Sequence, residues 1–259
     1  MGTEQSKCHV RDCLVAEGFR IEEIDPTPTE KRADLRAFWN NEEYVIEAKS
    51  REESKDWLAF VQQARPGAVT DISRQVRPWN AISSTIEEAH DQLLATPTQR
   101  EAFRILWMVA LHDDDGFVIK CVEKRLLGEV KVVVMKLGHE MPQIKHCFFY
   151  APSDFQRFPD LDAAVLSTRK GGKLCVNTFS PRVEALRGGR LYTLLASHRA
   201  VIDPATLEAT GKAFLIDKDY CGKPSAQGLW SYLRARYGVS TSVMLENQFN
   251  GLLSIPRDE

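Results

Sequence analysis

Three ionisable residues near the N-terminus have the types and spacing needed to hold a divalent cation and polarise a phosphate: Asp34, Glu47 and Lys49. They lie in two short β-rich runs joined by Asn40-Asn41, a good two-residue hairpin turn because asparagine tolerates positive φ. A hairpin folded there places Asp34 directly opposite Glu47, with Cβ atoms about 4.5 to 5.5 Å apart. Lys49 shares their face because side chains along a strand alternate with a period of two. The sequence therefore predicts two carboxylates and an ammonium on one patch of sheet.

Two opposed carboxylates destabilise a sheet unless a cation lies between them. A hard divalent ion with oxygen ligands fits this pair, Mg²⁺ first or Mn²⁺, since Mg²⁺ is typically held by one or two carboxylates together with water and phosphate oxygens. Such an ion polarises a phosphodiester and helps to generate a hydroxide nucleophile. Lys49 would orient the attacking water or stabilise charge on the phosphorus.

Asp34 followed after twelve residues by Glu47-Ala48-Lys49, with a helix before the hairpin and a long helix after it, resembles the PD-(D/E)XK nuclease superfamily. The resemblance covers residues 4–111 and implies an α/β fold with a restriction-endonuclease-like core, a mixed central sheet flanked by helices. It implies a magnesium-dependent endonuclease or exonuclease in which Asp34 and Glu47 bind the metal. Prokaryotic members of this family often act in defence against phage or in DNA repair.

The resemblance is incomplete at two points. Ala33 precedes Asp34 where the family name records a proline, although many members lack that proline. The family often adds a glutamate from the first helix to the metal site. Glu4, Asp12 and Glu17 all compete for that role here.

Acidic-x-Lys tripeptides occur by chance, so the three residues could also form the solvated face of an edge hairpin. Two other classes of function remain open. One is a nucleic-acid-binding or scaffold subunit on the same fold that no longer cuts. The other is a metal-independent toxin or interaction domain.

Basic residues that could contact a nucleic-acid backbone occur in two segments of the chain. Residues 169–190 contain six basic side chains and one acidic side chain, and further arginines follow the predicted site. A solvated basic surface is an equally good interpretation of such runs. The candidates are Arg51, Arg65, Arg74, Arg77, Arg169, Lys170, Lys173, Arg182, Arg187 and Arg190.

Hydrophobic periodicity predicts the elements that position these residues. A helix is expected over residues 4–17 with Gly18 as its stop, and a second over residues 71–95, kinked or divided at Pro78. The apolar run Phe103 to Leu111 predicts a strand buried on both faces. Further strands are expected at residues 19–24, 130–137, 147–150, 163–167 and 174–176, and a helix at residues 225–237. Gln75 and Gln92 lie beside the apolar stripe of the long helix, from which they could reach the site or the substrate; a packing or surface role is the first interpretation of both.

The whole composition restricts the class of protein. The chain has 259 residues, 43% of them hydrophobic, which suits one elaborated domain over 1–259 in which residues 112–259 form a C-terminal extension. A net charge of −2 excludes a global attraction to nucleic acid or lipid. Six cysteines without CxxC spacing favour reduced thiols. We expect a cytoplasmic protein without a membrane span that binds nucleic acid, with DNA as the first substrate to test, and that works with a partner protein or as a homodimer.

Overall fold

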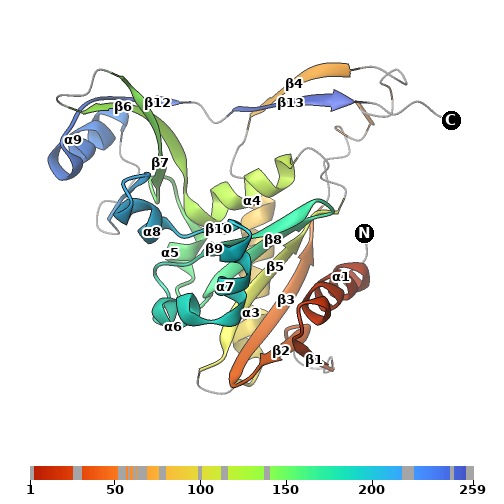
Figure 1. The fold of residues 1–259 in the computed structure, drawn as a ribbon. Coiled ribbons are helices and arrows are strands. Elements are labelled where there is room, and N and C mark those ends of the chain that lie inside the picture. The colour runs from red at the N-terminus through yellow and green to blue at the C-terminus, as the bar shows by residue number, and fades with distance from the viewer. Residues whose placement is uncertain are drawn as a thin grey trace.

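The structure is a computed structural model. It describes residues 3–25, 31–51, 57, 59–60, 63, 69–75, 80–98, 101–111, 116–136, 141–217, 225–245 and 248–254. Within these residues the chain is a mixed α/β protein with eight helices, a seven-stranded mixed sheet, a four-stranded mixed sheet and a two-stranded sheet (Figure 1).

The seven-stranded sheet forms the centre of the molecule. Its strands, in spatial order, are β1 Arg20–Glu23, β2 Leu35–Trp39, β3 Glu42–Ser50, β5 Phe103–Val109, β8 Ala163–Thr168, β9 Gly171–Val176 and β10 Val201–Ile202. β1, β2 and β3 are antiparallel neighbours, whereas β3, β5 and β8 run parallel. The carboxyl ends of these three parallel strands therefore meet at one edge of the sheet.

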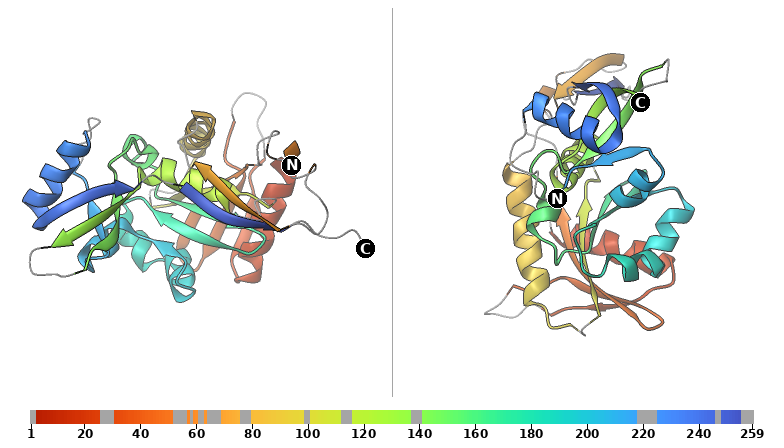
Figure 2. Two further views of the ribbon diagram at one scale, coloured as in Figure 1. Left: turned by 90° about the horizontal axis from the view of Figure 1, so that it is seen from above. Right: turned by 90° about the vertical axis from the view of Figure 1, so that its left-hand side faces the viewer.

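Helices cover both faces of this sheet. One face packs against α3 Asn80–Ala95, α4 Phe117–Leu127 and the short α5 Asp154–Arg157. The other packs against α1 Thr3–Ala16, α6 Val183–Gly188 and α7 Arg190–Ser197. Figure 2 shows α3 on one side of the sheet and α1 with α7 on the other. Alternate residues of β3 enter the two cores, so Val45 faces α3 while Ile46 faces α1.

Two smaller sheets extend from this core (Figure 1). The four-stranded sheet contains β11 Ala213–Leu215, β7 Gln143–Phe148, β6 Val130–Lys136 and β12 Val239–Leu245. Helix α9 Ala226–Tyr237 packs on it through Leu229 and Leu233, and α8 Pro204–Ala209 precedes β11. The two-stranded sheet pairs β4 Val69–Gln75 with β13 Gln248–Ser254.

Most elements expected from periodicity are confirmed with small shifts of their ends. Helix α1 stops where Gly18 adopts φ 85° and the Phe19 amide donates to the Leu14 carbonyl over 3.0 Å. Strand β7 begins earlier than expected, at Gln143, and ends before Phe149, whose φ is 62°. Helix α4 is not among the elements expected from periodicity, although eight of its eleven residues are buried.

The helical segment expected over residues 71–95, kinked or divided at Pro78, is wrong in its first part. Residues 69–75 form strand β4, and α3 begins only at Asn80, after Pro78. Val69, Thr70 and Ile72 are β-branched and favour a strand when a partner is present. That partner is β13, near the other end of the chain, so local periodicity carried no sign of it.

Candidate functional site

A hairpin in the predicted register carries the three ionisable residues. Asn40 has φ 50°, and Trp39 pairs with Glu42 across the turn. The Asp34 amide donates to the Ile46 carbonyl over 3.1 Å, which fixes Asp34 beside Glu47. The two-residue asparagine turn thus sets the register that brings the carboxylates together.

The Asp34 side chain is held from the neighbouring strand. Its Oδ2 accepts a hydrogen bond of 2.9 Å from the backbone amide of Ala48. Burial raises the pKa of Asp34 above its usual value, while this amide and the nearby Lys49 ammonium act in the opposite direction. The carboxylate is therefore fixed in position and only partly compensated.

Glu47 is almost fully buried, with 1% of its surface exposed. Its Oε1 lies 2.8 Å from the Lys49 Nζ, whereas its Oε2 is buried and has no hydrogen-bond partner among the described residues. Burial, together with the charge of Asp34 and a hydrogen bond with its carboxyl group, raises the pKa of Glu47 to about 8 against the opposing effect of Lys49. When both carboxyl groups are ionised, their two negative charges exceed the one charge of Lys49, and a cation bound between them would stabilise that form.

The ammonium of Lys49 is positioned by helix α3. Its Nζ donates to Gln92 Oε1 over 2.6 Å and lies 3.9 Å from Glu88 Oε1. Glu88 also pairs with Lys31 at 3.0 Å. Of the two roles that the sequence leaves open for Gln92, contact with the site is the one found, because its side chain accepts from Lys49. In the sequence, the available signal for this contact was the pair Glu88 and Gln92, four residues apart beside the apolar stripe of the helix.

The donor set at this site fits a hard divalent cation. Asp34 and Glu47 supply carboxylate oxygens, and the unpartnered Glu47 Oε2 is free to become a ligand. No group of three or more histidine, cysteine, aspartate or glutamate side chains suited to a metal occurs in the described part of the chain. Two carboxylates would leave the remaining coordination positions of the cation to water and substrate oxygens, which is a common arrangement for Mg²⁺.

The three acids of the first helix have neighbours away from this pair. Glu4 is in weak contact with the Cys8 thiol at 3.9 Å, and Asp12 pairs with Arg11 at 3.2 Å. Glu17 lines a cavity on the opposite face of the sheet. From the first helix it is the cation Lys7 whose charge acts on Asp34.

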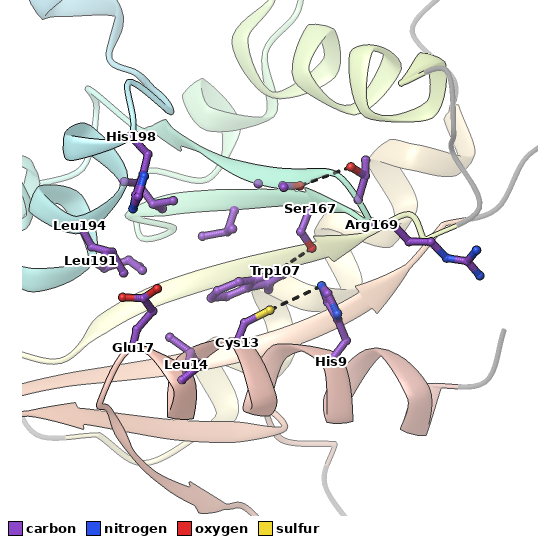
Figure 3. Close-up of a pocket in the computed structure, with 16 residues that line it drawn as sticks. His9, Cys13, Leu14, Glu17, Trp107, Ser167, Arg169, Leu191, Leu194 and His198 are labelled. Carbon is purple, nitrogen blue, oxygen red and sulfur yellow. Dashed lines mark hydrogen bonds between the residues drawn. The ribbon is translucent and has the colours of Figure 1, made fainter.

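That cavity, of about 380 Å³, lies between α1, α7 and the sheet (Figure 3). Figure 3 shows Glu17 and His198 near one end of it, His9 nearer the other, and Trp107 between them. Arg169, a predicted nucleic-acid contact, is also among its lining residues. The central sheet separates this cavity from Glu47, so Glu17 is not a candidate ligand for the same cation.

The other predicted nucleic-acid contacts fall into different environments. Arg51 follows the end of β3, where its amide donates to the Val109 carbonyl over 2.9 Å. Arg74 lies on β4 with its guanidinium 3.4 Å from the ring centre of Phe117. Arg65 and Arg77 lie outside the described residues.

Several cations of the basic segment 169–190 form internal ion pairs. Arg182 lies 2.9 Å from Asp162, a fully buried carboxylate, and Arg187 lies 2.8 Å from Asp203. The Arg190 guanidinium lies 4.4 Å from the ring centre of Trp39. Arg182 and Arg187 are therefore neutralised within the fold, and Lys173 likewise pairs with the buried Glu123. Lys170 lies exposed at the turn between β8 and β9.

Comparisons with known proteins do not add to this picture, because no family model, curated protein or solved structure matches the chain. Among the described helices, none combines the length and apolar character required to cross a bilayer. The site must therefore be interpreted from its own geometry.

Proposed function

We propose that this protein is a metal-dependent nuclease with a restriction-endonuclease-like core, in which Asp34 and Glu47 hold Mg²⁺ or Mn²⁺ and Lys49 assists hydrolysis of a phosphodiester. The observation that carries the proposal is the buried Glu47 carboxyl group, bonded to Lys49 on one oxygen and unpartnered on the other, beside Asp34. The order of helix, antiparallel strands, helix and parallel strand from α1 to β5 also supports it.

The metal would supply Lewis-acid activation of the phosphate and a lowered pKa for an attacking water. The chain itself contributes orientation. Ala48 fixes one oxygen of Asp34, and Gln92 holds the Lys49 ammonium next to Glu47. From this position Lys49 can orient a water for attack and offset the negative charge that develops on the phosphate oxygens.

DNA is the first substrate of the proposal. The site lies close to the carboxyl end of β3, at the edge of the sheet where ligands of open α/β sheets commonly bind. In this proposal, the lysines and arginines around this edge would contact backbone phosphates, which carry no sequence information. We therefore expect cleavage with little dependence on base sequence.

The direct test is a cleavage assay with plasmid, linear duplex, single-stranded DNA and RNA in the presence of Mg²⁺ or Mn²⁺. We expect Glu47→Gln, Asp34→Asn and Lys49→Met each to lower kcat/KM by about 100-fold or more. Glu43→Gln is the matched control. Glu43 is a second buried glutamate on the same side of β3, four residues from Glu47, and it lies 3.7 Å from Arg36.

The assay separates a real activity from a contaminant. Cleavage that survives unchanged in the Glu47→Gln and Lys49→Met proteins would not come from this site. Absence of cleavage on every substrate, with oligonucleotide binding retained, would instead support the interpretation as a binding subunit that does not cut.

A further inference from the structure

A second cavity, of about 440 Å³, lies on the same face of the sheet as Glu47, between the first turns of α4 and the β8–β9 turn. Of the described residues that line it, three are lysines and none is acidic or aromatic. They are Gly116, Ile119, Lys120, Leu166, Thr168, Lys170, Gly171, Gly172 and Lys173. The composition favours an anionic ligand that does not need base stacking.

The register of the sheet aligns this cavity with the proposed site. Lys49 pairs with Met108 on β5, Met108 with Leu166 on β8, and Leu166 with Lys173 on β9. Three strand spacings separate Lys49 from Lys173, which is roughly 14 to 15 Å. A duplex strand, which rises about 3.4 Å per nucleotide, covers that distance in about four nucleotides.

A buried acid on α4 positions two of the lysines. Glu123 is 2% exposed, and its Oε1 lies 2.6 Å from the Lys120 Nζ while its Oε2 accepts from the Lys173 ammonium. The charge of the buried Glu129 also acts on Lys120, so these two carboxylates offset part of the positive charge of the three lysines around the cavity.

We propose that the cavity of Lys120, Lys170 and Lys173 binds backbone phosphates of the nucleic acid whose scissile bond lies at Asp34 and Glu47. The inference rests on the proposed nuclease function and deepens it by assigning a path for the substrate past the carboxyl ends of β3, β5 and β8, beyond the buried Met108 and Leu166. Lysine ammonium groups act here as point charges, which suits contacts that position a backbone without reading its sequence.

The experiment measures binding of fluorescein-labelled duplex and single-stranded oligonucleotides by anisotropy, at several salt concentrations. The Glu47→Gln protein serves as background so that the probe is not cut. Lys170→Gln, an exposed change, and Lys120→Gln are introduced singly. Lys212→Gln is the matched control, because Lys212 is an exposed lysine beside β11, on a different sheet.

Each cavity variant should lose one phosphate contact. The slope of log affinity against log salt for the duplex should become less negative by about 0.9, and affinity near 0.1 M salt should fall about eightfold. Lys212→Gln should change neither quantity. In the otherwise wild-type protein, Lys170→Gln should raise KM for cleavage and leave kcat nearly unchanged, because Lys170 does not contact the reacting phosphate.

The results distinguish this inference from the nuclease proposal. Weakened binding in the cavity variants without cleavage by any form of the protein would retain the phosphate site and reject the nuclease. Cleavage by the wild type, with binding by Lys170→Gln and Lys120→Gln equal to that of Lys212→Gln, would reject the phosphate site and retain the nuclease. Failure of the Glu47→Gln protein to bind either oligonucleotide would also overturn the phosphate site.

Discussion

Binding of Mg²⁺ to the carboxylate pair should release a proton from Glu47. Burial and the Asp34 charge raise the pKa of Glu47 to about 8, so its carboxyl group is mostly protonated in the metal-free protein at neutral pH. A divalent ligand needs the ionised form and must displace that proton. The apparent affinity for Mg²⁺ therefore depends on pH in a range where an ordinary glutamate, with a pKa of 4.5, would show no dependence.

The size of the effect follows from that pKa. At pH 6, about two units below it, roughly 1% of Glu47 is ionised, so the apparent affinity should be about 100-fold weaker than above pH 8. The stability of the metal-free protein has the matching sign. The contribution of protonated Glu47 to the free energy of unfolding is fully present below about pH 4.5 and is lost as the pH rises through about 8.

Isothermal titration calorimetry with Mg²⁺ checks this prediction when it is performed at three pH values in buffers that differ in ionisation enthalpy. We expect about one proton released per ion at pH 6, and close to none above pH 9. Glu47→Gln should remove both the binding and the proton release without lowering the metal-free melting temperature, since glutamine resembles the protonated acid. Glu43→Gln should behave as the wild type.

Two results would refute the reasoning. An affinity that stays constant between pH 6 and 8 would show that Glu47 is already ionised. Binding that persists in Glu47→Gln would place the cation elsewhere.

Three further predictions concern other parts of the fold. Replacing Gln92 by leucine removes the 2.6 Å acceptor for Lys49, and we expect kcat to fall about 10- to 100-fold at an unchanged KM; equal turnover would assign Gln92 to packing alone. Burial alone would raise the pKa of Glu129. The hydrogen bond with His146 outweighs burial and lowers that pKa from 4.5 to about 2. The ionised Glu129 therefore stabilises the fold above pH 4.5, and this contribution is lost as the pH falls through 2. In urea denaturation at neutral pH, the free energy of unfolding of Glu129→Gln should be lower than that of the wild type by on the order of 3 kcal/mol, and the difference should vanish near pH 2. A difference independent of pH would contradict this. Gly128 and Gly211 have φ 56° and 69°, but only at Gly128 would an added Cβ meet a backbone oxygen, at 2.1 Å. In thermal denaturation, Gly211→Ala should therefore lower the free energy of unfolding by about 1 kcal/mol, and Gly128→Ala should lower it by at least twice that. Equal decreases would show that the backbone at Gly128 relaxes.

Interactions that depend on neighbours in the chain could be predicted well. The Asn40-Asn41 turn and the alternation along β3 were enough to place Asp34 opposite Glu47 and Lys49 beside it, because a hairpin register is set by its own turn. The buried strand β5 was equally clear from a continuous apolar run. These features need only local geometry.

Interactions between remote segments could not be predicted in this way. β4 gave a helical pattern because its partner β13 lies near the other end of the chain. Arg182 was expected to be available to phosphate, but the fold pairs it with the buried Asp162. A count of charges along the sequence cannot distinguish a cation that faces solvent from one that neutralises a buried acid.

The local pattern of the chain was sufficient to identify the three groups that could act on a phosphate and to place them on a common face. Their protonation and orientation depend on tertiary packing. Packing of α3 against β3 buries Glu47, brings Gln92 to Lys49 and raises the pKa of Glu47, and these effects depend on the solvent excluded by segments that are distant in the chain.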